Sequence, residues 1–254
     1  MNKRTLALAF FLLAALCLSA ETFSAVSLTT PSDLENFKSE VGFAHRFYGV
    51  VNHEPLDTFF GTSWGANVQA GFRQHLVKGT ELKLAYISAL KQYQVGAAWQ
   101  FTPRDFPLNA QIDVTYASFK PLGIFDRETD IGVLLSAQSD AFFDRLAVTL
   151  NAGYNTYYER IAAGVGVHLL LTEDLSLIGE YYPLLEDANN SDNLYQVGDH
   201  SAFSAGLKMD TWGHSFVLSV SNAAAFDPTQ NSLGADSKGK LQLGFNIKRR
   251  LSLF

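Results

Sequence analysis

Hydrophobic and polar residues alternate along most of this chain, so that every second residue is apolar. In residues 64–73, for example, Ala66, Val68 and Ala70 alternate with Asn67 and Gln69. A period of two is typical of a β-strand that has one apolar and one polar face. The pattern recurs in segments 41–51, 64–73, 81–86, 92–101, 108–116, 130–136, 145–155, 160–169, 175–181, 203–210, 215–221 and 241–248. An all-β fold of about 12 strands, within roughly 10 to 14, is therefore expected.

The positions of glycine indicate which strand face points inward. Gly179 lies on an apolar face, but ten glycines share the polar phase of their segments: Gly42, Gly65, Gly71, Gly96, Gly132, Gly153, Gly164, Gly166, Gly206 and Gly244. Glycine weakens a solvent-facing strand, whereas in the crowded lumen of a narrow barrel it leaves room for longer neighbours. We therefore expect a closed antiparallel transmembrane up-and-down β-barrel with its apolar face toward lipid. A soluble periplasmic barrel or sandwich is the alternative.

The two ends of the chain indicate export to the outer membrane of a Gram-negative bacterium. Lys3 and Arg4 precede a short apolar run and the small residues Ser19 and Ala20, which is the order of a signal peptide. Cleavage after Ala20 is favoured, and cleavage after Ala25 is the alternative. We predict a signal peptide over residues 1–20, a periplasmic lead-in over residues 21–38 and an outer-membrane barrel over residues 39–254. The last amphipathic strand and the terminal phenylalanine fit such a barrel.

Loop lengths and composition support this topology. With both ends in the periplasm, the inner turns are short, whereas the outer connections at residues 52–63, 183–200 and 222–239 are longer. Aromatic residues near the strand ends predict two interfacial girdles: Trp64, Tyr93, Tyr116, Tyr154, Tyr157 and Tyr181 at one rim, and Trp99, Phe101, Phe142, Phe143 and Trp212 at the other. Cys17 is the only cysteine and lies in the leader, which excludes disulfides and cysteine chemistry from the exported chain.

Charged residues of both signs share the polar phase and are the candidate site residues. The expected lumen-lining set is Glu40, Arg46, Arg73, Glu81, Lys83, Asp113, Asp130, Arg145, Arg160, Glu180, Lys208 and Lys248. Pairing across the barrel would make a structural plug, because a buried unpaired charge is costly. Charges on opposite walls of a wet channel would instead select solutes. We predict that Arg73 pairs with Glu81 first and with Glu40 second, and that Arg46 pairs across the lumen.

Several blocks resemble an uncharacterised family of bacterial outer-membrane barrels. They are residues 41–47 (VGFAHRF), 61–72 (GTSWGANVQAGF), 175–182 (LSLIGEYY), 213–222 (GHSFVLSVSN) and 243–247 (LGFNI). The resemblance implies the barrel fold and an outer-membrane location but no known activity. One departure concerns the end of the chain, where Leu251 takes the in-phase position that members give to an aromatic residue, and Phe254 is out of phase.

No metal, phosphate or cofactor motif is present, and we expect no cofactor. A lipid hydrolase would need a serine–histidine pair at the outer rim, for which His53 with Ser63 or His200 with Ser201 are the candidates. Outside the leader the chain has 17 basic residues, which are the 19 of the full sequence without Lys3 and Arg4, against 25 acidic ones. This balance argues against nucleic acid as a partner.

The sequence favours a narrow passive pore or a structural barrel over an enzyme. An outer-membrane lipid-modifying hydrolase and a soluble periplasmic barrel that binds a small ligand are the alternatives. The expected partners are outer-membrane lipids, the barrel-assembly machinery and, for an open lumen, small solutes.

Overall fold

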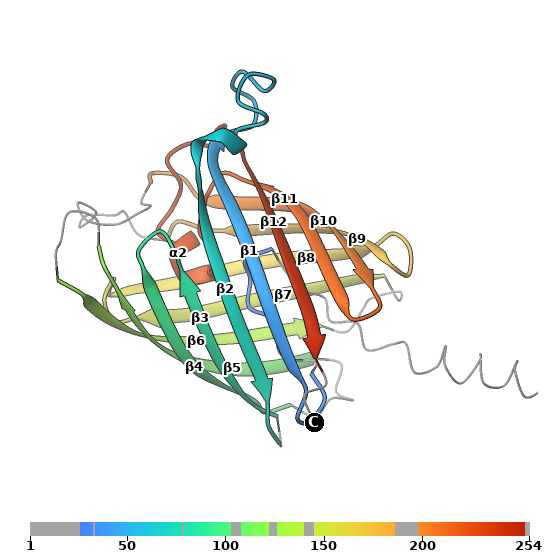
Figure 1. Cartoon of the computed structure of the whole chain (residues 1–254). Coiled ribbons are helices and arrows are strands. Elements are labelled where there is room, and N and C mark those ends of the chain that lie inside the picture. Colours follow the sequence, from blue (N-terminus) through green and yellow to red (C-terminus); the bar gives the residue numbers. More distant parts are fainter. Residues whose placement is uncertain are drawn as a thin grey trace, which may run out of the picture.

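Twelve antiparallel strands close into one barrel (Figure 1). The computed structural model describes residues 26–32, 34–77, 79–102, 108–121, 126–139, 145–185 and 198–251. The strands are β1 (Ser39–Val50), β2 (Ala66–His75), β3 (Thr80–Ile87), β4 (Gln92–Gln100), β5 (Leu108–Phe119), β6 (Glu128–Ser139), β7 (Leu146–Asn155), β8 (Arg160–Leu170), β9 (Leu175–Tyr182), β10 (Ala202–Thr211), β11 (His214–Ser221) and β12 (Gln242–Leu251). Each strand pairs with its neighbours in sequence, and β1 pairs with β12 to close the sheet. The predicted closed 12-strand barrel is confirmed.

The apolar face of the strands points outward. On β5, for example, Val114 and Tyr116 are about half exposed, whereas Gln111, Asp113 and Ala117 are buried on the inner face. The same exposure of large apolar side chains recurs on the other strands, at Leu84, Val95, Val133, Leu150, Val167 and Leu218 among others. This distribution is the reverse of a water-soluble protein, where polar groups face outward. It fits a barrel whose outer surface contacts lipid.

The connections alternate in length as the sequence predicted. At one end, Trp212 and Gly213 alone join β10 to β11, and Gly213 adopts a positive φ of 76° that suits this tight turn. At the other end, long connections follow β1, β9 and β11. The first contains a 3-10 helix, η1 (Thr62–Trp64), and the last contains a short α-helix, α2 (Pro228–Asn231). The predicted signal peptide, the turn at residues 103–107, Phe142, Phe143 and Phe254 lie outside the described residues.

Most of the predicted rim aromatics are exposed on the outer surface, including Trp64, Tyr93, Trp99 and Trp212. Tyr157 differs, because it packs edge-on against Phe119 in the turn between β7 and β8. Among the described residues, no helix is long and apolar enough to cross a membrane.

The structure corrects the expected periplasmic lead-in over residues 26–32, whereas Glu35 and Phe37 further along it are exposed. Residues 26–32 lie inside the barrel, where Val26 and Leu28 are buried and their backbone groups bond side chains of the inner wall. Inside the barrel, the side chains of Val26 and Leu28 are removed from water, and the backbone groups of the segment still find hydrogen-bond partners. In the periplasm both side chains would remain exposed to water.

The outward apolar face generates the first prediction. Val165 lies in the middle of β8, between Leu150 of β7 and Tyr181 of β9, and is exposed on the outer face. Val165→Arg should cost about 2–4 kcal/mol of barrel stability near the bilayer centre, because a charge is poorly solvated by lipid. The measurement is urea unfolding in bilayers, followed by the heat-dependent gel shift. Leu56→Arg, at an exposed site in the β1–β2 connection, is the control. Equal stability of the two variants would contradict an outward lipid-facing surface.

Candidate functional site: the barrel interior

The amino-terminal segment 26–32 is held in the lumen by hydrogen bonds to the inner wall. The backbone N–H groups of Val26, Ser27 and Leu28 all donate to the buried carboxylate of Glu180 on β9. Further along, Asn151 of β7 both accepts from Thr29 N and donates to Thr29 O, each at 2.8 Å. Ser32 N then donates to Gln111 Oε1 of β5 at 2.8 Å. These bonds replace the strand pairing that this stretch of backbone lacks.

Glycines of β8 make the space for this segment. A Cβ atom at Gly166 would lie 2.4 Å from Leu28 Cδ1, and one at Gly164 would lie 2.6 Å from Leu28 Cδ2. Any larger residue would therefore displace Leu28, which packs against Tyr182 and Ala202. From the sequence, inward glycines are expected to leave room for long neighbouring side chains. At these two positions the neighbour is the amino-terminal segment itself.

Arg46 connects the segment to the opposite wall. Its Nη2 donates to Val26 O at 3.0 Å, and its Nη1 donates to Asn246 Oδ1 of β12 at 2.7 Å. The guanidinium also lies over the Phe226 ring, 5.1 Å from the ring centroid. Arg46 was expected to pair across the lumen. Its hydrogen bonds go to the side-chain amide of Asn246 and to backbone carbonyl oxygens instead of a carboxylate. Gly244 of β12 leaves the room that this side chain needs, since a Cβ there would lie 2.7 Å from Arg46 Cδ.

A second segment, the β11–β12 connection, also folds into the lumen. Ala223, Ala224 and Phe226 are buried, and α2 follows them. Hydrogen bonds attach this segment to the wall, among them Asn67 Nδ2 to Ala224 O, Gln230 Nε2 to Gln92 Oε1, and Ser232 Oγ to Ala163 O. Ser27 Oγ donates to Ala225 O at 3.4 Å and so joins the two inserted segments. This connection was expected to be an outer loop, although its run from Ala223 to Phe226 is unusually apolar for one.

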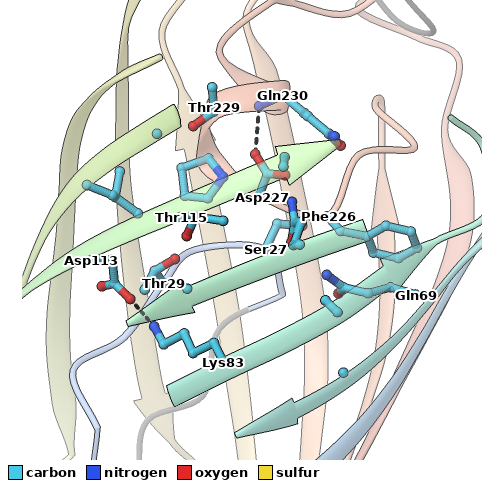
Figure 2. Close-up of a pocket in the computed structure, with 18 of the residues that line it drawn as sticks. Ser27, Thr29, Gln69, Lys83, Asp113, Thr115, Phe226, Asp227, Thr229 and Gln230 are labelled. Carbon is cyan, nitrogen blue, oxygen red and sulfur yellow. Dashed lines mark hydrogen bonds and ion pairs between the residues drawn. The ribbon is translucent and has the colours of Figure 1, made fainter. Parts of the chain in front are cut away.

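A cavity of about 280 Å³ remains between these segments and the wall formed by β1 to β6 (Figure 2). The wall contributes charged residues of both signs, namely Glu40, Arg73, Lys83, Asp113, Asp130 and, from β12, Lys248. Thr29 and Ser27 of the amino-terminal segment and Asp227, Thr229 and Gln230 of the β11–β12 connection line the other side. Both inserted segments and half of the barrel therefore border one cavity that has charged residues of both signs on its wall.

The charges of β1 to β5 form a connected network. Arg73 binds Glu81 with two hydrogen bonds, of 2.8 Å from Nε and 3.0 Å from Nη2, and contacts Glu40 at 3.4 Å. Both predicted partners of Arg73, and their order, are confirmed. Lys83 lies 3.7 Å from Glu81 and forms an ion pair with Asp113.

Small residues on the intervening strand allow the Lys83–Asp113 pair to form. Lys83 is on β3 and Asp113 is on β5, so the contact crosses β4 (Figure 2). Gly96 is the β4 residue that pairs with Lys83, and Ala98 is the one that pairs with Asp113. Neither has a side chain long enough to block the path.

The other charged residues that were expected to line the lumen lie at different positions in the barrel. Asp130 binds Thr156 Oγ1 and Tyr157 N, each at 3.0 Å, and so fixes the turn between β7 and β8. Lys208 forms an ion pair with Asp210 at 2.6 Å on β10, away from the cavity. Arg160 begins β8 on the inward phase. Arg145 differs from the expectation, because it precedes β7 and is exposed in the turn.

The candidate hydrolase residues have other contacts. Ser63 Oγ donates to Thr58 O at 3.1 Å, and both side chains of the His53–Ser63 pair are exposed in the β1–β2 connection. Ser201 Oγ accepts hydrogen bonds from Tyr181 Oη and Leu184 N. Within the described ranges, neither serine is hydrogen-bonded to its candidate histidine.

Comparison with known proteins places the chain in a class. Residues 139–251 match the model of a family described as a membrane-bound β-barrel domain (DUF5777). The protein is a membrane-bound β-barrel. The match covers three of the five resembling blocks, those at residues 175–182, 213–222 and 243–247, and confirms the resemblance to an uncharacterised barrel family. Together with the outward apolar face, it favours a membrane barrel over the soluble periplasmic alternative.

Solved structures are similar to this membrane barrel in fold. The alignment with the KdgM porin covers 85% of this chain and 99% of the porin, at 8% identity and a TM-score of 0.52. The structure of the KdgM porin in complex with disordered oligogalacturonate gives a TM-score of 0.53. The alignment with the Omp33 outer membrane protein of Acinetobacter baumannii covers 86% of this chain and 99% of Omp33, at 14% identity and a TM-score of 0.47. No protein of curated function matches the sequence. At these identities the likeness concerns the fold alone.

The Arg73 network generates a prediction about the stability of the membrane barrel. Glu81 is fully buried, so Arg73→Gln would leave its carboxylate with Lys83 as the remaining cation, at 3.7 Å. We expect a loss of about 3 kcal/mol in the free energy of unfolding, because a buried charge that loses its partner is costly. Urea titration in bilayers measures it. The Arg73→Gln/Glu81→Gln double variant should recover most of the loss, and failure to recover would show that the charges are not coupled.

A second prediction concerns Asp227, which caps α2 by accepting a hydrogen bond from Gln230 N at 2.8 Å. Burial raises the pKa of the Asp227 carboxyl to about 6, and the Asp130 carboxylate adds to the increase. The pKa of Asp227 in the folded protein lies above its unfolded value of about 3.9. The protonated carboxyl therefore contributes fully to the free energy of unfolding at a pH below about 3.9. This contribution is lost as the pH rises through about 6.

Asp227→Asn should remove this dependence, since asparagine caps a helix equally well and does not titrate. The difference in free energy of unfolding between Asp227→Asn and the unmodified protein should therefore grow from pH 4 to pH 7. Parallel pH curves for the two proteins would contradict the raised pKa.

Proposed function

We propose that this membrane barrel is a narrow passive pore of the outer membrane that admits small polar solutes. The observation that carries the proposal is the wall of charged residues that the inserted segments leave uncovered. Arg73, Lys83 and Lys248 supply positive charge there, and Glu40 and Asp113 supply negative charge. A lumen lined by both signs of charge is a polar constriction, which passes small hydrated solutes and discriminates among them by charge.

The size of the lumen limits the class of solute. The two inserted segments occupy part of the lumen. They bond β7 to β9 through Asn151, Ala163 and Glu180. They also bond β2, β4 and β5 through Asn67, Gln92 and Gln111. The remaining space of about 280 Å³ lies just below the range for ligand sites in proteins, which begins at about 300 Å³. Ions and small polar molecules fit such a space, whereas folded polymers do not.

The outer-membrane location is supported by several features together. An export signal is expected at residues 1–20, the apolar face points outward, and the solved barrels of similar fold include outer-membrane porins. A pore is favoured over a hydrolase because the hydroxyls of Ser63 and Ser201 are bound to groups other than the candidate histidines. Outer-membrane lipids and the assembly machinery remain the expected partners, and small solutes join them through the proposed pore.

Single-channel recording in planar bilayers tests the proposal. We expect discrete openings of small conductance, and a shift in ion selectivity when Lys248→Gln removes a positive charge from the cavity wall. Lys91→Gln is the control, because Lys91 is exposed in the outer turn between β3 and β4. The readout is the reversal potential in a salt gradient, which should move toward cation preference for Lys248→Gln alone.

Two results would contradict the pore. Absence of conductance from correctly folded protein would favour a purely structural barrel. Absence of conductance together with hydrolysis of phospholipid or lipid A would favour the lipid hydrolase. An equal change in ion selectivity for Lys91→Gln and Lys248→Gln would show that the ions do not pass through the described cavity.

A further inference from the structure

Three successive backbone nitrogens converge on one carboxylate at the start of the described chain. Val26 N makes the closest contact with Glu180, Ser27 N lies 2.9 and 3.1 Å from its two oxygens, and Leu28 N lies 3.4 Å away. Tyr182 Oη and Ser204 Oγ donate to the same carboxylate at 2.7 and 2.9 Å. The structure thus gathers five donors around a single buried acidic group, with Val26 at its centre.

The charge of Glu180 lacks a bonded cation in this arrangement. Glu180 is 5% exposed, and the ion pairs found within the described ranges involve other carboxylates. Arg46 donates to the carbonyl oxygen of Val26, and its charge acts on the Glu180 carboxylate without a direct bond between the two side chains in the described structure. Neutral donors bond the oxygens of Glu180, and a cation bonded directly to a buried carboxylate stabilises that charge further.

We propose that the exported chain is cut between Ala25 and Val26, and that the new α-ammonium group of Val26 is the cation that binds Glu180. The cut is hydrolysis of one amide bond by a signal peptidase. Water adds its hydroxyl to the carbonyl carbon of Ala25, which leaves as a carboxylate, and the nitrogen of Val26 takes up the protons and becomes an ammonium. An α-amino group has a pKa near 8, so it is charged at neutral pH.

The residues around the two candidate cleavage sites do not favour one site over the other. Small residues occupy the last two positions of both leaders, Ser19 and Ala20 in one and Ser24 and Ala25 in the other. Leu18 and Phe23 are large residues at the third position, so neither site completes the small–any–small pattern. Cleavage after Ala20 would leave an uncharged amide nitrogen at Val26. Cleavage after Ala25 places a charge at the atom closest to Glu180.

The cut has a structural consequence for the inserted segment. Val26 would then connect two walls of the barrel, with its ammonium on Glu180 of β9 and its carbonyl on Arg46 of β1 and Asn246 of β12. A charged end fixes the register of the segment, because an ammonium–carboxylate bond is stronger than one between neutral groups. The proposal is independent of whether the lumen conducts.

The first test is the mass and amino-terminal sequence of the protein purified from the outer membrane. We expect a chain that begins with Val26. A chain that begins with Glu21, or with any residue other than Val26, would overturn the proposal. This measurement requires no variant and does not depend on any effect on folding.

The second test asks whether the α-ammonium group is held by Glu180. The folded protein in detergent is treated with an amine-reactive reagent near neutral pH, and labelling of Val26 is followed by peptide mapping. We expect labelling to be at least about tenfold slower than in the heat-unfolded chain, because the buried group reacts only after local opening. Glu180→Gln should restore much of the rate, whereas Glu35→Gln, at an exposed acid in the same lead-in, should not.

The heat-dependent gel shift of Glu180→Gln verifies that the barrel has closed before its labelling is compared. Unprotected labelling of Val26 in the folded unmodified protein would contradict the Glu180 contact. Equal protection in Glu180→Gln and Glu35→Gln would contradict it as well.

Discussion

Closure of the sheet between β1 and β12 is the constraint on which the rest of this structure depends. It removes both edges of the sheet, so that every strand has its backbone hydrogen bonds and the outer face can be wholly apolar. The polar side chains of twelve strands are then confined to one narrow lumen. Each charge placed there must find a partner inside the barrel, because lipid offers none.

The lumen meets this requirement in two ways. On β1 to β5, side chains satisfy one another, as in the bidentate Arg73–Glu81 contact and the Lys83–Asp113 pair across β4. On β7 to β12, the partners are backbone groups of the amino-terminal segment, which bind Glu180, Asn151 and Asn246. The second inserted segment is bound in the same way by Asn67 of β2. Glycine and alanine decide where each solution applies. Gly164 and Gly166 open a space for Leu28, and Gly96 opens a path for Lys83.

The sequence predicted the parts of the structure that depend on local pattern. A period of two identifies a strand and its faces, so all twelve strands, their inward phase and the alternation of short and long connections could be inferred. The Arg73–Glu81 contact was also predictable, because both residues lie near the short turn of one hairpin, where the register follows from the turn. The inserted segments were not. Val26 and Leu28 carry no periodic signal, and their partners Glu180 and Gly166 are more than a hundred residues away in sequence. The apolar run from Ala223 to Phe226 was the one signal that could have indicated the second insertion.

The position of the amino-terminal segment inside the barrel is the central claim, and a cysteine pair tests it most directly. Cys17 is the only cysteine of the sequence and lies in the expected signal peptide, so a Leu28→Cys/Gly164→Cys variant places two further thiols at known positions. Leu28 packs directly over Gly164, where a Cβ atom would lie 2.6 Å from Leu28 Cδ2. A short thiol-bridging reagent should join the two cysteines in the folded barrel, and proteolytic mapping should recover the amino-terminal peptide linked to β8. Separate labelling of both cysteines by a soluble thiol reagent, with no linked peptide, would contradict the account.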